Sequence, residues 1–180
     1  MKQMSQNELS NLFHELLSFL MNYDEKWIRF YFADELEFFC FLSDDEDLRL
    51  LTGHNAQNEI SSLIILCENA ILTAVFSPDA ENEDAYTDAL SDMEALLKAQ
   101  HYTGIYYGEG YYSYGVFSGE TENPFGAFLK KNGFAVESVF YDIHHTASDT
   151  VEEHVDQLKA QKITTAFDVC GRYESLYKRL

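Results

Sequence analysis

The residue types best suited to bind a ligand lie in a segment rich in glycine and tyrosine, residues 108–119. Its glycines permit sharp backbone turns, and its tyrosines offer flat apolar faces and phenol donors that could hold an amine, a peptide or an aromatic ligand. Glu109, as a base or as the anchor of an amine, and Tyr112 are the candidate catalytic residues. The alternative is structural, with alternate tyrosines packing on a sheet and the others lining a surface loop. The tyrosines concerned are Tyr106, Tyr107, Tyr111, Tyr112 and Tyr114.

The second candidate site is an acidic segment, residues 81–86, which reads ENEDAY and precedes a long helical pattern. Acidic side chains in a first helical turn complement the helix dipole. Ser77, Asp79 or Asn82 could cap this helix through a side-chain oxygen. The structural interpretation is therefore that the segment only begins a helix well.

The elements around this segment follow a recognisable order. An apolar strand over 71–76 runs into the V-x-x-P-D turn that ends at Asp79, then come the acidic segment, a helix over 84–100 and a strand over 103–107. A later short helix ends in Asn132-Gly133-Phe134. This order resembles the GNAT superfamily of N-acetyltransferases. The resemblance implies an α/β (α+β) fold, a mixed and mostly antiparallel sheet flanked by helices, with acetyl-CoA as the cofactor.

In the GNAT family, the loop before the helix binds the pyrophosphate of the coenzyme through backbone N–H groups at the helix N-terminus. That loop carries an Arg or Gln, two residues, a Gly, one residue, and a Gly or Ala; these positions correspond here to Glu81, Asp84 and Tyr86. Side chains thus stand where the backbone must approach the ligand closely, and carboxylates stand where the ligand is an anion. Each like-charge pair at about 4 Å costs on the order of 1 kcal/mol even in water. We expect acetyl-CoA binding to be weak or lost.

Two further positions come from the same resemblance. The family's usual general acid, a tyrosine four residues before the Gly of the closing Gly-Phe pair, corresponds to Leu129, which cannot donate a proton. Asn123, before Pro124, is either a helix cap or a contact for the pantetheine arm of the coenzyme. The candidate cofactor-binding residues are Val75, Ser77, Asn82, Ala85, Tyr86 and Asn123.

Composition predicts a single globular domain over residues 1–180, because 46% of the residues are hydrophobic and only two are proline. No apolar run is long enough to span a bilayer and no leader-like segment is present, so we expect a cytoplasmic protein. His144, His145 and His154 lack the spacing of metal ligands, and we expect no metal.

The formal net charge of −19 narrows the range of partners. No Lys or Arg lies between Arg49 and Lys98, or between Lys98 and Lys130. Such a surface repels nucleic acid and anionic membranes. Either the acidity serves only solubility, or an acidic face binds a cationic small molecule or a basic protein.

Periodicity predicts the remaining elements. An N-terminal part, 1–58, contains an amphipathic helix over 5–22 and two aromatic strands, 27–32 and 37–42. The core, 59–146, adds a hairpin of strands 60–67 and 71–76 and a strand over 135–144. The C-terminal part, 147–180, consists of a helix over 150–161, a strand over 162–169 and a short terminal helix.

Two hypotheses follow. The first is a GNAT-like N-acyltransferase that acts on a cationic amine or basic peptide and holds acetyl-CoA mainly through backbone contacts. The second is a non-catalytic acidic binding protein, such as an immunity-type inhibitor or a regulatory domain, that recognises a basic protein. They differ on whether the gap between the strands 71–76 and 103–107 is open or is filled by Tyr86 and its neighbours.

Overall fold

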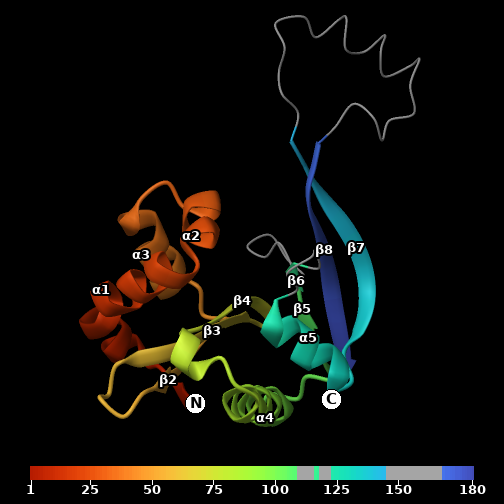
Figure 1. The fold of residues 1–180 in the computed structure, drawn as a ribbon. Helices are drawn as coiled ribbons and strands as arrows, with labels where there is room; N and C mark the ends of the chain where they lie inside the picture. Colours follow the sequence, from red (N-terminus) through yellow and green to blue (C-terminus); the bar gives the residue numbers. More distant parts are fainter. Residues whose placement is uncertain (109–115, 118–122, 145–167) are drawn as a thin grey trace, which may run out of the picture.

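The computed structural model describes residues 1–108, 116–117, 123–144 and 168–180 (Figure 1). The helices are α1 (Gln6–Tyr23), α2 (Glu25–Tyr31), α3 (Glu35–Asp44), the 3-10 turn η1 (Pro78–Ala80), α4 (Glu83–Ala99) and α5 (Pro124–Lys131). The strands are β1 (Lys2–Gln3), β2 (Leu48–His54), β3 (Ile60–Cys67), β4 (Ala70–Phe76), β5 (Gly104–Tyr107), β6 (Val116–Phe117), β7 (Ala135–His144) and β8 (Asp168–Arg179). None of the helices in this described part is long and apolar enough to cross a membrane.

All the strands of the described residues join one mixed sheet, in which β1 to β5 follow one another in sequence order and β8 pairs with β5. Strand β6 pairs with the same edge of β8 as β5 does, and β7 pairs with the opposite edge. Among the pairings of the described strands, that of β4 with β5 is parallel and the others are antiparallel. The expected mixed, mostly antiparallel sheet flanked by helices is therefore confirmed, as is the β3–β4 hairpin.

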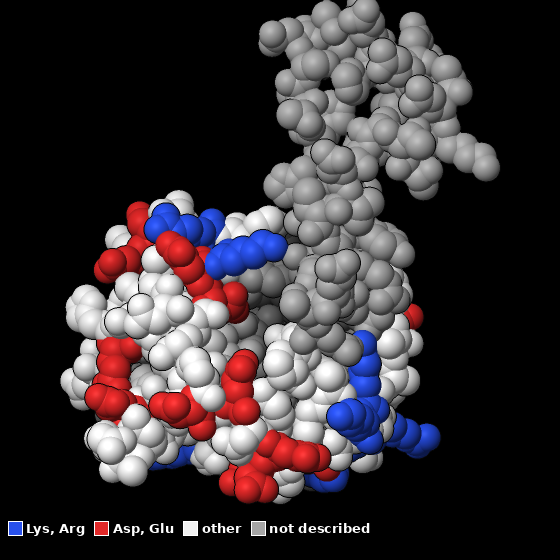
Figure 2. All heavy atoms as spheres, in the orientation of Figure 1, with Lys and Arg blue, Asp and Glu red and all other residues white. Residues whose placement is uncertain are grey.

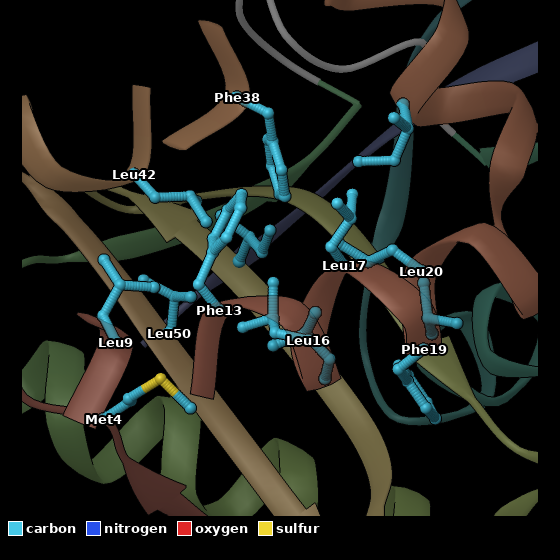
Figure 3. Packing of buried hydrophobic residues seen from close by; sticks show 14 of the residues in the cluster. Met4, Leu9, Phe13, Leu16, Leu17, Phe19, Leu20, Phe38, Leu42 and Leu50 are labelled. Carbon is cyan, nitrogen blue, oxygen red and sulfur yellow. The ribbon is translucent and has the colours of Figure 1, made fainter. Parts of the chain in front are cut away.

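A separate hydrophobic cluster lies on each face of the sheet. Helices α1, α2 and α3 cover one face and α4 lies on the opposite one, where α5 shares its cluster (Figure 1). Helix α1 buries Leu16 and Leu20 completely, and Figure 3 shows its apolar side chains packed with Phe38 of α3 and Leu50 of β2. The predicted helix is thus confirmed, and a capping box between Ser5 and Glu8 fixes its N-terminus.

The two strands predicted over 27–32 and 37–42 are wrong, because these segments form α2 and α3. Their aromatic residues suggested β-structure, but Asp34 caps α3 by accepting a hydrogen bond from the Glu37 N–H at 2.9 Å. Phe38 and Leu42 lie four residues apart on one buried helical face. Packing of that face against α1 decides the helical form.

The short terminal helix is also wrong, because residues 168–179 form β8. This strand lies between β5 and β7 and pairs with both, so its backbone hydrogen bonds come from segments that are distant in sequence. The predicted helix over 150–161 and most of the predicted strand over 162–169 fall outside the described residues.

Candidate functional site between strands β4 and β5

Strands β4 and β5 pair at two positions, at the end of β5. Ala70 and Ile71 pair with Tyr106 and Tyr107, after which β4 continues to Phe76 whereas β5 ends. Here the register between β3 and β4 also shifts, so that Ile65 pairs with Thr73, Leu66 pairs with Ile71, and the intervening Leu72 is a bulge. A bulge bends and twists its strand locally, and this one lies directly after the two residues of β4 that pair with β5.

Five aromatic side chains, here called the aromatic cluster, connect β4 with β5 on the side of α4 and α5. They are Phe76 of β4, Tyr86 of α4, Tyr107 of β5, and Phe125 and Phe128 of α5. The ring of Tyr86 lies 4.8 Å from Phe76, 5.3 Å from Phe125 and 5.5 Å from Phe128, between ring centroids. Phe125 lies 5.0 Å from Phe76 and 6.4 Å from Tyr107. Ring contacts thus run without interruption from β4 to β5.

Tyr86 belongs to the interior, with only 6% of its surface exposed. Burial, and next the negative charge of Glu81, raises the pKa of its phenol to about 12. The side chain therefore stays neutral at physiological pH and acts as a filler of the space between helix and sheet.

The backbone N–H groups around the acidic segment are largely engaged within the protein. The Ala85 N–H donates to the side-chain oxygen of the N-cap Asn82 at 3.0 Å, and the Tyr86 N–H donates to the Asn82 carbonyl at 3.1 Å. Asn82 itself donates to the Ala80 carbonyl at 2.9 Å, and Ser77 donates to the Ser61 carbonyl at 2.8 Å. The prediction that this segment begins a helix well is thereby confirmed.

The remaining predicted site residues belong to different elements of the fold. Val75 pairs with Leu63 inside the sheet, and Asn123 caps α5 by accepting a hydrogen bond from the Gly126 N–H at 2.9 Å. Leu129, which belongs to α5, is fully buried. Glu109 and Tyr112 lie outside the described residues, so the site in the glycine and tyrosine segment stays a prediction.

A polar group that the sequence did not predict lies beside β4. Asp24, between α1 and α2, accepts a hydrogen bond from the Thr73 hydroxyl of β4 at 2.9 Å. Burial, and next the charge of Asp24, raises the pKa of Tyr107, while a hydrogen bond from the Ala74 N–H opposes this rise. Nothing local in the sequence marks Asp24, which resembles any aspartate at a helix end.

Acidic side chains surround the start of α4. Glu81, Glu83 and Asp84 are exposed around the start of α4. Figure 2 shows acidic side chains spread across the visible face, and basic side chains mainly in its upper and lower right parts. Residues 50–97, which include β4 and the start of α4, contain no Lys or Arg.

Comparisons with known proteins identify the fold. No protein-family model matches this sequence, and no curated protein matches it. Among solved structures, an aminoglycoside 6'-acetyltransferase type Ii superposes with a TM-score of 0.60 at 11% identity, over 99% of this chain and 97% of that one. An IAA acetyltransferase from Bacillus cereus ATCC 14579 gives 0.57 at 12% identity, over 99% and 97%. A spermidine N-acetyltransferase chimera that includes the Vibrio cholerae enzyme gives 0.56 at 14% identity, over 99% and 96%.

These full-length superpositions confirm the resemblance that the order of elements predicted. The chain has the fold of the GCN5-related N-acetyltransferases, the GNAT fold. At such low identities the likeness establishes the fold alone.

Proposed function

We propose that this protein is a GNAT-like N-acyltransferase for a cationic amine or basic peptide, in which residues 81–86 bind acetyl-CoA only weakly. The fold supports the reaction class. Solved structures of similar fold include enzymes named for spermidine and for aminoglycosides, which are cationic amines. The net charge of −19 favours ligands of that kind.

The burial of Tyr86 is the main observation in support of weak acetyl-CoA binding. On the GNAT pattern this position needs a Gly or Ala, yet here it holds a ring packed among Phe76, Phe125 and Phe128. Glu81 and Asp84 add two carboxylates beside the expected pyrophosphate. Two like-charge pairs of about 1 kcal/mol each weaken binding about 30-fold, before the engaged N–H groups of Ala85 and Tyr86 are considered.

A non-catalytic binding protein is the second candidate, and two observations favour it. Tyr86 and its aromatic neighbours occupy the space between β4 and β5, as this hypothesis expects. Leu129 occupies the position of the family's usual general acid and lies fully buried. In this alternative the acidic surface recognises a basic protein, and the GNAT fold serves as the scaffold.

Calorimetric titration of acetyl-CoA tests the cofactor proposal. Wild-type protein should bind with a Kd of about 1 mM or weaker, because the loop repels the diphosphate. The triple variant Glu81→Arg, Asp84→Gly and Tyr86→Gly should bind at least about 30-fold more tightly. A control pair with the same charge change, Glu46→Arg with Asp47→Asn, should behave as wild type. Micromolar binding by the wild type would contradict the proposal.

The double variant Glu81→Arg with Asp84→Gly keeps Tyr86, so the test remains decisive even if the triple variant unfolds. Release of the coenzyme thiol from millimolar acetyl-CoA in the presence of spermidine then separates the two candidates. Turnover above the uncatalysed rate supports the transferase. Background rates in both the wild type and the loop variants exclude spermidine transfer and favour the binding protein.

A further inference from the structure

The phenol of Tyr107 lies inside the protein at the end of β5. Tyr107 is the last residue of that strand, pairs with Ile71 of β4 and Leu176 of β8, and is only 4% exposed. Its ring belongs to the aromatic cluster and lies 6.4 Å from that of Phe125 between centroids. Because burial raises the pKa of Tyr107, the phenol stays neutral and its oxygen can accept a hydrogen bond.

The partner of the phenol oxygen is in the backbone of β4. The oxygen accepts a hydrogen bond from the N–H of Ala74, which lies further along β4 than Ile71, the last residue of β4 that pairs with the described part of β5. Ala74 is itself buried, with 8% of its surface exposed, and pairs with Ile64 of β3. A buried N–H without an acceptor destabilises a fold, so the phenol satisfies a requirement of β4.

This hydrogen bond takes the place of one between strands. A strand N–H ordinarily donates to the carbonyl of a neighbouring strand, whereas the acceptor here is a side chain that extends along β4 from the end of β5. An extended ligand chain with amide groups binds a strand through the same N–H and carbonyl groups, as an added strand does. The Ala74 N–H is a group that such a chain would need, and Tyr107 already uses it.

We propose that Tyr107 keeps an extended, amide-bearing chain away from this part of β4, and that the chain it excludes is the pantetheine arm of acetyl-CoA. The arm can bond to Ala74 only after it displaces the phenol, and this weakens binding independently of the charges of residues 81–86. The inference rests on the proposed function, since the fold gives the reason to expect acetyl-CoA. It adds a residue that determines ligand access, and this residue belongs to β5 rather than to the loop before α4.

Calorimetric titration of pantetheine tests the inference, because this compound has no phosphate for the carboxylates of residues 81–86 to repel. The wild type should show no saturable binding at millimolar pantetheine. Tyr107→Leu, which keeps apolar volume and removes the phenol, should bind at least about tenfold more tightly than the limit set by the wild type. Phe128→Ala is the matched control. It removes a ring of the same cluster, keeps the phenol on Ala74 and should gain no binding.

A second measurement follows the Ala74 amide itself. Tyr107→Phe removes the hydroxyl and keeps the ring, so the Ala74 N–H loses its acceptor. Hydrogen exchange of this N–H should accelerate at least about tenfold relative to that of the Tyr106 N–H. The Tyr106 N–H is a suitable reference because it donates to the Asn69 carbonyl at 2.9 Å, a bond that the substitution leaves in place.

Three results would each overturn the inference: saturable binding of pantetheine by the wild type, no gain in binding by a folded Tyr107→Leu, or unchanged exchange of Ala74 in Tyr107→Phe. If Tyr107→Leu fails to fold by circular dichroism, Tyr107→Phe decides, since pantetheine should shift the Ala74 amide resonance in that variant and not in the wild type. Failure here is distinguishable from failure of the acetyl-CoA titration. All the loop variants keep Tyr107 and change only the contact with the diphosphate, which pantetheine lacks.

Discussion

At the scale of single residues, Asn82 and Tyr86 determine the structure at the start of α4. Asn82 was one of three predicted caps, and the structure selects it because its side-chain oxygen reaches the Ala85 N–H. Its role could be predicted from the sequence, because capping involves residues that are close together in the chain. The burial of Tyr86 was not predictable, since its neighbours Phe76 and Phe125 come from other elements.

Removal of this cap should destabilise the protein measurably. Asn82→Ala should lower the free energy of unfolding by about 1 kcal/mol, because the Ala85 N–H loses its acceptor. Urea denaturation followed by circular dichroism measures the change, with the exposed Gln57→Ala as the control at under about 0.5 kcal/mol. An unchanged unfolding midpoint for Asn82→Ala would show that the cap is dispensable.

At the scale of elements, periodic segments were predictable and aromatic ones were not. Helix α1 repeats its apolar residues with helical spacing and carries a capping box, and β3 and β4 are apolar runs joined by a tight turn. Segments 25–31 and 35–44 are rich in aromatic residues, which favour strands in isolation. Contact with α1 overrides that preference.

A matched pair of phenylalanines tests the helical packing of α2 and α3. Phe38→Ala should destabilise the protein by about 3–5 kcal/mol, because its ring is fully buried against Phe13 and Trp27. Phe30→Ala should change stability by less than about 0.5 kcal/mol, because 67% of this residue is exposed. Chemical denaturation of the two variants gives both values. Similar losses for the two would contradict the helical assignment.

At the scale of the whole molecule, Glu94 ties α4 to the last strand. Its carboxylate accepts hydrogen bonds from Lys178 of β8 at 2.6 Å and from Lys98 of α4 at 3.1 Å. Burial alone would raise the pKa of Glu94, but the hydrogen bonds and charges of the two lysines outweigh burial and lower it. The chain has 12 Lys and Arg residues against 31 Asp and Glu residues, and two of these lysines pair with Glu94.

This linkage predicts a definite pH dependence. Because the pKa of Glu94 is lower in the folded than in the unfolded protein, its contribution is complete above the ordinary value of 4.5 and disappears as pH falls through the folded value. Glu94→Gln should therefore reduce stability by about 1 kcal/mol at pH 7, and the difference should shrink below pH 4.5. Thermal unfolding across pH measures it, with exposed Asp88→Asn as the control. A difference that grows on acidification would refute the assignment.

The sequence by itself determined the order of elements, the position of α1, the β3–β4 hairpin, the start of α4 and the resemblance to the GNAT fold. These features rest on periodicity, turns and caps, which operate within a few residues. Only the tertiary structure decided that α2 and α3 are helices, that β8 enters the sheet between β5 and β7, and that an aromatic cluster connects β4 to β5. It also placed Asp24 beside Thr73, which lies 49 residues away in the chain. Contacts of that kind arise from packing between distant segments, so no local sequence pattern predicts them.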